Sequence, residues 1–169
     1  MTTPTHIAVG YFITRGFVHY GGLPDLNSTY LLGIVFANAP DIDALFFYRP
    51  LYTHRDNMYS MSHYPITWFV LWSIATITVW AIAPQYVLYS LMIGASLGSH
   101  FILDSIDIFE GIAWLGPWIK TKFSILPVVS PTLTADAPWT TLYQIYRTHW
   151  AFYAEFIVCV TALVVAFIS

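Results

Sequence analysis

Four short blocks of histidine and aspartate carry most of the chemistry that this chain could perform. They are His6, the run Pro40-Asp41-Ile42-Asp43, the pair His54-Arg55 followed by His63, and His100 followed by Asp104 and Asp107. Imidazole and carboxylate groups are ligands for zinc, manganese or iron, and these blocks contain no thiolate that would select a softer metal. The residue types therefore favour a site for a divalent ion.

The last block has the most informative spacing. His100 and Asp104 are four residues apart, and Asp107 follows three residues later. A helix would present all three side chains on one face. A histidine at a helix end, capped by a carboxylate, explains the first pair equally well.

The second block combines a helix-breaking proline with two carboxylates. Pro40 removes a backbone donor and interrupts a helix, so that Asp41 or Asp43 could cap the freed amides. Capping accounts for one of the two aspartates more easily than for both. We therefore expect at least one of them to bind metal.

The composition places these blocks in a membrane protein. The chain has 169 residues, of which 57% are hydrophobic and 9% are charged, whereas about 25% of a soluble domain is charged. Ionisable residues are costly in a membrane and mark functional sites by default.

A net charge of −3 argues against nucleic-acid binding, which needs clustered Lys and Arg. The single cysteine excludes an intramolecular disulfide.

The apolar runs predict one domain over residues 1–169, an all-α integral membrane bundle of four to five spans. About 20 apolar residues cross the hydrocarbon core. The expected spans are residues 5–22 (the weakest), 29–48, 64–83, 86–106 and 150–168. The long connection 108–148 is rich in proline, aromatic and apolar residues, and we expect it to form a re-entrant or interfacial segment over the site.

The basic residues predict the orientation. Apart from Arg15 in the first predicted span, Lys and Arg lie in the loop 49–63 and in the connection 108–148, and the turn at Pro84-Gln85 has none. The positive-inside rule places the basic side in the cytoplasm. The same orientation brings the four blocks to one level of the cytoplasmic leaflet of a multi-pass inner membrane protein. It excludes His19 from the predicted site and places His149 at the margin of that site.

In order and content, the blocks over residues 5 to about 128 resemble the YdjM-like family of membrane-bound metal-dependent hydrolases. The family pattern is an early histidine, then Pro-Asp-Ile-Asp, then His-Arg with a second histidine, then His-x-x-x-Asp leading to a glycine and a proline. This chain has His6, Asp41 and Asp43, His54-Arg55 with His63, and His100 with Asp104, followed by Gly111 and Pro117. The two histidines of the third block are nine residues apart here, where the family has them four apart, so the ligand is His54 or His63. More distantly, the order of residues is similar to the zinc-dependent phospholipase C and single-strand nuclease superfamily.

Together, the residues and the resemblance imply a metal-dependent hydrolase of a lipid or lipid-linked phosphoester. One or two divalent ions, zinc or alternatively manganese or iron, would be held by a set drawn from His6, Asp41, Asp43, His54, His63, His100 and Asp104. A bound ion would lower the pKa of water toward ~7 and polarise the phosphoryl oxygen. Asp43 or Asp107 would act as general base, and Arg55 would hold the phosphate. The alternative is a non-enzymatic metal-binding protein, either a transporter or a structural adaptor.

Overall fold

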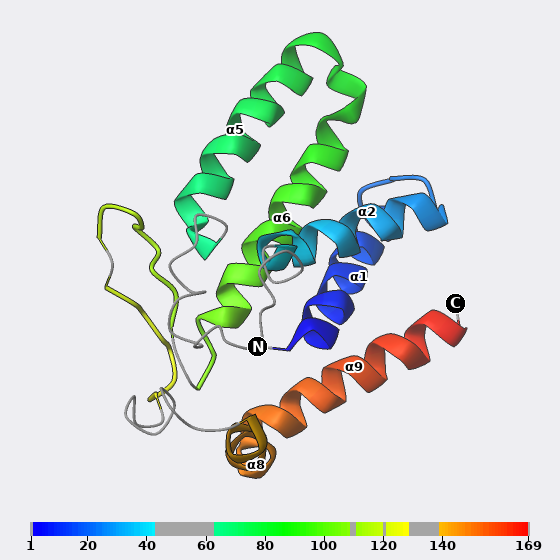
Figure 1. The fold of residues 1–169 in the computed structure, drawn as a ribbon. Coiled ribbons are helices and arrows are strands. Elements are labelled where there is room, and N and C mark those ends of the chain that lie inside the picture. Colours follow the sequence, from blue (N-terminus) through cyan, green and yellow to red (C-terminus); the bar gives the residue numbers. More distant parts are fainter. Residues whose placement is uncertain (1, 43–62, 109–110, 120, 129–138, 169) are drawn as a thin grey trace.

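The computed structural model describes residues 2–42, 63–108, 111–119, 121–128 and 139–168, and their regular structure is helical (Figure 1). In chain order the elements are α1 (Thr3–His19), α2 (Asn27–Asn38), the 3-10 turn η1 (Ala39–Asp41), α5 (Pro65–Ile82), the 3-10 turn η3 (Pro84–Tyr86), α6 (Val87–Asp104), α8 (Trp139–Thr148) and α9 (Trp150–Ile168). The only β pairing among the described residues is one isolated bridge. The prediction of an all-α fold is confirmed.

Helices α5 and α6 form a long antiparallel hairpin with its turn at η3 (Figure 1). Pro65 starts α5, a position where the missing amide hydrogen costs nothing. The indole of Trp72 donates to the carbonyl of Ser90 at 2.7 Å, and the hydroxyls of Thr76 and Ser90 are 2.6 Å apart. A Cβ at Gly94 would overlap the ring of Trp72. These contacts hold the two helices together inside an otherwise apolar pair.

Three helices are long and apolar enough to cross a membrane: Pro65–Ile82, Pro84–Asp104 and Trp150–Ile168. They correspond to three of the five predicted spans. The predicted span 5–22 becomes α1, whose 17 residues extend about 25 Å, short of the roughly 30 Å hydrocarbon core. In the predicted span 29–48, α2 has only 12 residues before η1, and residues 43–48 lie outside the described part. A fourth or fifth span stays a prediction.

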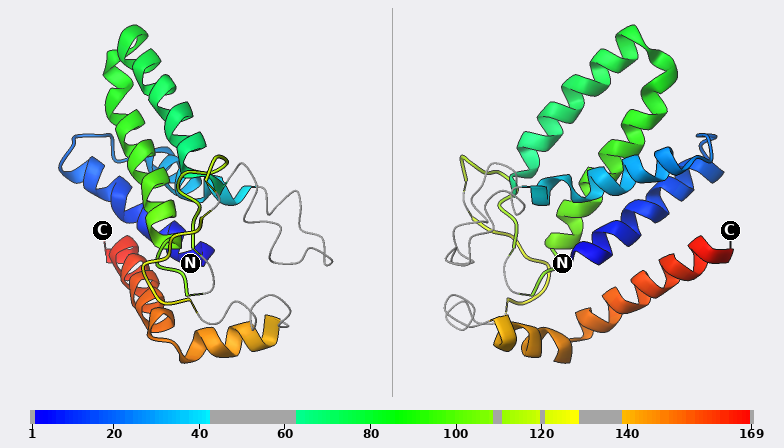
Figure 2. Two further views of the ribbon diagram at one scale, coloured as in Figure 1. Left: turned by 90° about the vertical axis from the view of Figure 1, so that its left-hand side faces the viewer. Right: turned by 45° about the vertical axis from the view of Figure 1, so that its right-hand side comes forward.

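Helices α1 and α2 form a second antiparallel hairpin that packs against α6 (Figure 2). Its turn includes Gly22 at φ +80°, a conformation that glycine adopts without steric cost. The helices approach closely at Gly33, where a Cβ would overlap the hydroxyl of Thr14. That hydroxyl donates to the carbonyl of Gly10 at 2.9 Å. The hairpin brings the start of α1 and the end of α2 to the same region of α6.

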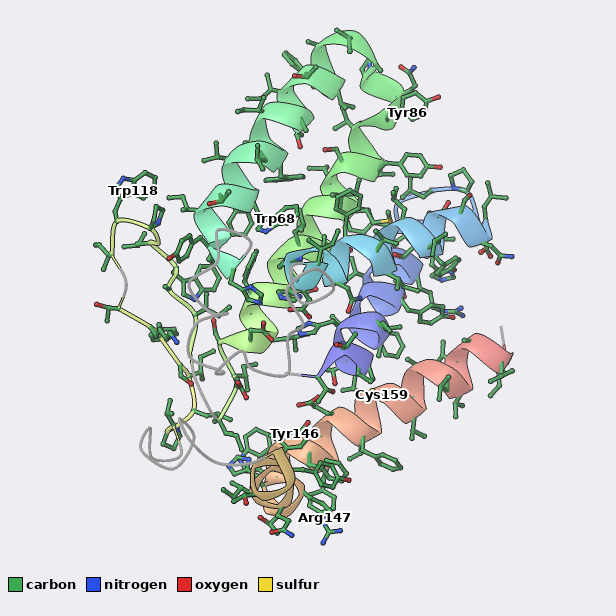
Figure 3. All side chains as sticks on the ribbon, viewed as in Figure 1. Trp68, Tyr86, Trp118, Tyr146, Arg147 and Cys159 are labelled. Carbon is green, nitrogen blue, oxygen red and sulfur yellow. The ribbon has the colours of Figure 1, made fainter. Side chains whose placement is uncertain are left out.

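The carboxylate of Glu155 attaches α9 to the start of α1. Glu155 is only 5% exposed and accepts hydrogen bonds from the Thr2 amide at 3.1 Å, the Thr5 hydroxyl at 2.5 Å and the Thr2 hydroxyl. Tyr146 of α8 lies near the start of α9 (Figure 3). Burial, together with a hydrogen bond to Glu155, raises the pKa of the Tyr146 hydroxyl. A buried charge needs such donors. Here they hold Thr5, the residue before His6, against α9.

Candidate metal centre

The ends of four elements meet at the end of the α5–α6 hairpin that is opposite the η3 turn (Figure 1). His6 lies near the start of α1, and Asp41 is the last residue of η1. His63 comes two residues before α5, and both His100 and Asp104 lie at the end of α6. The two helical hairpins thus bring together residues that are up to 98 positions apart, from His6 to Asp104.

Asp41, His63, His100 and Asp104 form a group whose potential ligand atoms all lie within 4.8 Å of one another. Asp41 Oδ1 is 3.3 Å from His63 Nε2 and 3.6 Å from His100 Nε2, and Asp104 Oδ2 is 3.2 Å from His100 Nε2. Charge-assisted hydrogen bonds are shorter, about 2.7–2.9 Å. Ligands about 2.0–2.2 Å from a tetrahedral zinc ion would be about 3.3–3.6 Å apart, which is close to the spacing found here.

The hydrogen bonding of His100 indicates what its second nitrogen can do. Its side chain is fully buried, and Nδ1 lies 2.8 Å from the backbone carbonyl oxygen of Ala37. That carbonyl can only accept, so Nδ1 carries the proton and donates. In the neutral ring, Nε2 then has a lone pair, and a backbone acceptor of this kind commonly fixes the tautomer of a metal-binding histidine.

The Nε2 atom of His100 is buried without a hydrogen-bond partner, although it lies near two carboxylates. A lone pair facing two anionic oxygens is unfavourable unless a cation lies between them. That cation is either a proton on the ring or a metal ion bound by all three groups. Two imidazoles and two carboxylates are a donor set that suits a divalent ion. The residues present therefore fit a metal ion.

His6 extends the cluster beside His100 and Asp104. Its Nε2 is 3.1 Å from Asp104 Oδ1, and its ring stacks on that of His100 with centroids 4.2 Å apart. His6 is 1% exposed, and neither of its ring nitrogens makes a hydrogen bond of good geometry. The carboxylate of Asp104 therefore presents one oxygen to the Nε2 atom of each of the two stacked imidazoles.

The structure brings together five of the predicted site residues: His6, Asp41, His63, His100 and Asp104. Asp43, His54 and Arg55 lie outside the described residues. Asp107 is described but does not belong to the four-residue group; its backbone carbonyl accepts from the Ser124 hydroxyl at 2.9 Å. The prediction for it as a general base stays a prediction.

Two histidines lie elsewhere: His19, which the predicted orientation excluded from the site, and His149, which it left at the margin. His19 is exposed in the last turn of α1, at the end away from His6. His149 accepts the amide hydrogen of Ala151 on its Nδ1 at 3.2 Å, and so it caps the start of α9. Neither contributes to the group around His100.

Sequence reasoning missed the carbonyl of Ala37. This group is available because α2 ends at Asn38, and the last four carbonyls of a helix have no partner within it. The one signal was Pro40, which predicted that the helix breaks near this position. Which carbonyl would then face His100 depends on the packing of α2 against α6.

Comparisons with known proteins identify a family. Neither the curated proteins nor the solved structures give a match. The model of the YdjM inner membrane protein family matches residues 1–169, the whole of the chain. This match confirms the resemblance seen in the His and Asp blocks, and it agrees with the three long apolar helices in placing the protein in a membrane. The chain belongs to the YdjM inner membrane protein family.

Proposed function

We propose that this protein is a membrane-bound, metal-dependent hydrolase that cleaves a phosphoester of a lipid or lipid-linked substrate at the cytoplasmic leaflet. The observation that carries the proposal is the environment of His100. Its buried Nε2 faces the carboxylates of Asp41 and Asp104 at the spacing of metal ligands, with His63 completing the group.

The four candidate ligands differ in exposure, which suggests how a substrate reaches them. The side chain of His100 is buried, those of Asp104 and His63 are 13% and 14% exposed, and that of Asp41 is the most exposed at 30%. A substrate phosphate would therefore approach from the side of Asp41 in η1. His6, which stacks on His100 and contacts Asp104, would orient that carboxylate or bind a second ion.

The chemistry follows from the ligand set. A divalent ion held here, with zinc as first choice and manganese or iron as alternatives, would act as a Lewis acid toward a phosphoryl oxygen and make water more acidic. Asp107 or Asp43 would accept the proton from the attacking water, and Arg55 would hold the phosphate. His100 and Asp104 would anchor the site from the end of α6.

A lipid or lipid-linked substrate fits the position of the group. The cluster lies at the ends of helices that are apolar enough to span a membrane, where a headgroup phosphate and its acyl tail would both be accommodated. Other phosphoesters lack the tail that this position would use.

The test is hydrolysis by purified protein that has been loaded with zinc, manganese or iron. Phosphatidic acid, a lipid diphosphate and a lipid phosphodiester are each offered in mixed micelles, and phosphate or headgroup release is followed. We expect release from one class, loss of release after chelation, and loss in His100→Ala. The control is Asp25→Asn, a carboxylate in the turn between α1 and α2.

Two results would contradict the proposal. Hydrolysis that persists in His100→Ala would exclude the metal centre as the catalytic site. Stoichiometric metal without hydrolysis of any of the three classes would favour the non-enzymatic alternative, a transporter or a structural adaptor.

A further inference from the structure

The segment that follows α6 forms a hairpin-like loop beside α5. Ile112 and Phe123 exchange two backbone hydrogen bonds, each 2.9 Å long, which close the loop at its base. The loop lies on the α5 side of the molecule, away from α1 and α9, in Figure 1 and in the right-hand view of Figure 2. Trp118 lies at its outer edge (Figure 3).

The loop exposes large apolar side chains over a short stretch of sequence. The exposed fractions are 53% for Leu115, 76% for Trp118, 50% for Ile119, 56% for Phe123 and 57% for Ile125. Soluble surfaces rarely gather apolar side chains in this way, and such patches usually mark a surface that contacts a protein or a membrane.

The other side of the loop is fixed against the start of α5. A Cβ at Gly116 would overlap the ring of Tyr64, and Tyr64 is only 3% exposed. Tyr64 immediately precedes Pro65, the first residue of α5, and α5 is one of the candidate spans. The contact between Gly116 and Tyr64 therefore holds the loop at the level where α5 would enter the bilayer.

The chemistry of the loop favours the boundary of the bilayer over its centre. Lipid-exposed irregular backbone is not found in the hydrocarbon region, because its amide and carbonyl groups have no partners there. Tryptophan, in contrast, is enriched where headgroups meet acyl chains, since its ring is apolar and its N–H can reach a polar partner.

We propose that Leu115, Trp118 and Ile119 form an interfacial anchor that inserts into the phospholipid leaflet on the side of the metal-site residues. The occupant of this surface is the bilayer, because the loop is held beside a helix that enters it. The anchor also stabilises the position of Tyr64, the neighbour of His63. This inference does not depend on the hydrolase proposal.

The test uses the depth of a spin label. Cys159, the single cysteine, is replaced by serine, and Trp118→Cys is labelled in the full chain, reconstituted in vesicles of phosphatidylcholine and phosphatidylglycerol. Accessibility to oxygen and to a water-soluble nickel chelate gives the depth. Ile77→Cys, exposed on α5, provides the reference for the acyl region, and free label in buffer provides the reference for water.

We expect the label at Trp118 to show accessibility between the two references. Accessibility equal to that of free label would overturn the proposal, because the loop would then lie in water. Accessibility equal to that at Ile77 would overturn the interfacial placement. Leu115→Cys provides a second labelled position if Trp118→Cys does not fold, and the same three outcomes apply to it.

Discussion

Replacing Asp104 with asparagine distinguishes a metal centre from a network of salt bridges. The two side chains have nearly the same shape, and the change removes one negative charge. The two carboxylate oxygens of Asp104 lie 3.1 Å from His6 Nε2 and 3.2 Å from His100 Nε2, respectively. An amide is a much weaker ligand for a divalent ion of this type than a carboxylate, so we expect the variant to lose the ion while the helices stay in place.

The size of the effect follows from binding linkage. An ion present at about 100 times its dissociation constant stabilises the folded state by about 2.7 kcal/mol. For a chain of this length, each kcal/mol raises the melting temperature by about 2–4 °C. Zinc should therefore raise the melting temperature of the wild-type protein by about 5–11 °C relative to chelated protein, and it should raise that of Asp104→Asn hardly at all.

The assay is thermal unfolding in detergent, followed by tryptophan fluorescence, with zinc or with excess EDTA. The matched control is Asp25→Asn, which makes the same chemical change in an exposed turn and should keep the full zinc-dependent shift. A salt-bridge network would give a different pattern: no shift in the wild type, and a loss of about 3–5 kcal/mol in the variant in either buffer. That pattern, or an undiminished shift in Asp104→Asn, would refute the assignment.

Two further substitutions test the packing that positions the site. Gly33→Val should destabilise the protein by about 1–3 kcal/mol, measured by thermal unfolding, because the new side chain would overlap Thr14. Glu155→Ala should detach α9 from the start of α1, because it removes the acceptor of three hydrogen bonds. The labelling of Cys159 by N-ethylmaleimide should then become several-fold faster, since its sulfur lies 4.0 Å from the Thr5 hydroxyl.

Each substitution has a control in the same helix or in the helix packed against it. At Gly16 of α1 a Cβ would meet nothing within 4 Å, so Gly16→Ala should be neutral or stabilising by about 0.5–1 kcal/mol. Thr161→Ala, at an exposed position of α9, should leave the labelling rate unchanged. Equal destabilisation by both glycine variants would contradict the close packing of α1 and α2, and unchanged labelling in Glu155→Ala would contradict the attachment of α9.

The α5–α6 hairpin and the central pair of the site could be predicted from the sequence because their signals are local. Uncharged apolar runs bounded by Pro65 and Pro84 define the two helices. The four-residue spacing of His100 and Asp104 places them on one face of a helix, and the structure confirms that the two side chains meet at 3.2 Å.

The early part of the chain was harder to predict because its structure depends on contacts between distant residues. The sequence predicted a span over residues 29–48 with a break near Pro40, and α2 ends there, at Asn38, and passes into a 3-10 turn. The position of His6 depends on the packing of α1 against α2 and on Glu155, 150 residues beyond Thr5. The sequence alone gives no register for either contact.

The central claim, a metal ion held by the group around His100, is tested most directly by elemental analysis of the purified protein. Wild-type protein, the single variants His100→Ala and Asp104→Asn, and Asp25→Asn are loaded with zinc, manganese or iron and dialysed together. A metal centre predicts at least one ion per chain in the wild type and in Asp25→Asn, and a loss of that ion in the other two. Equal metal content in all four proteins, or none in the wild type, would contradict it.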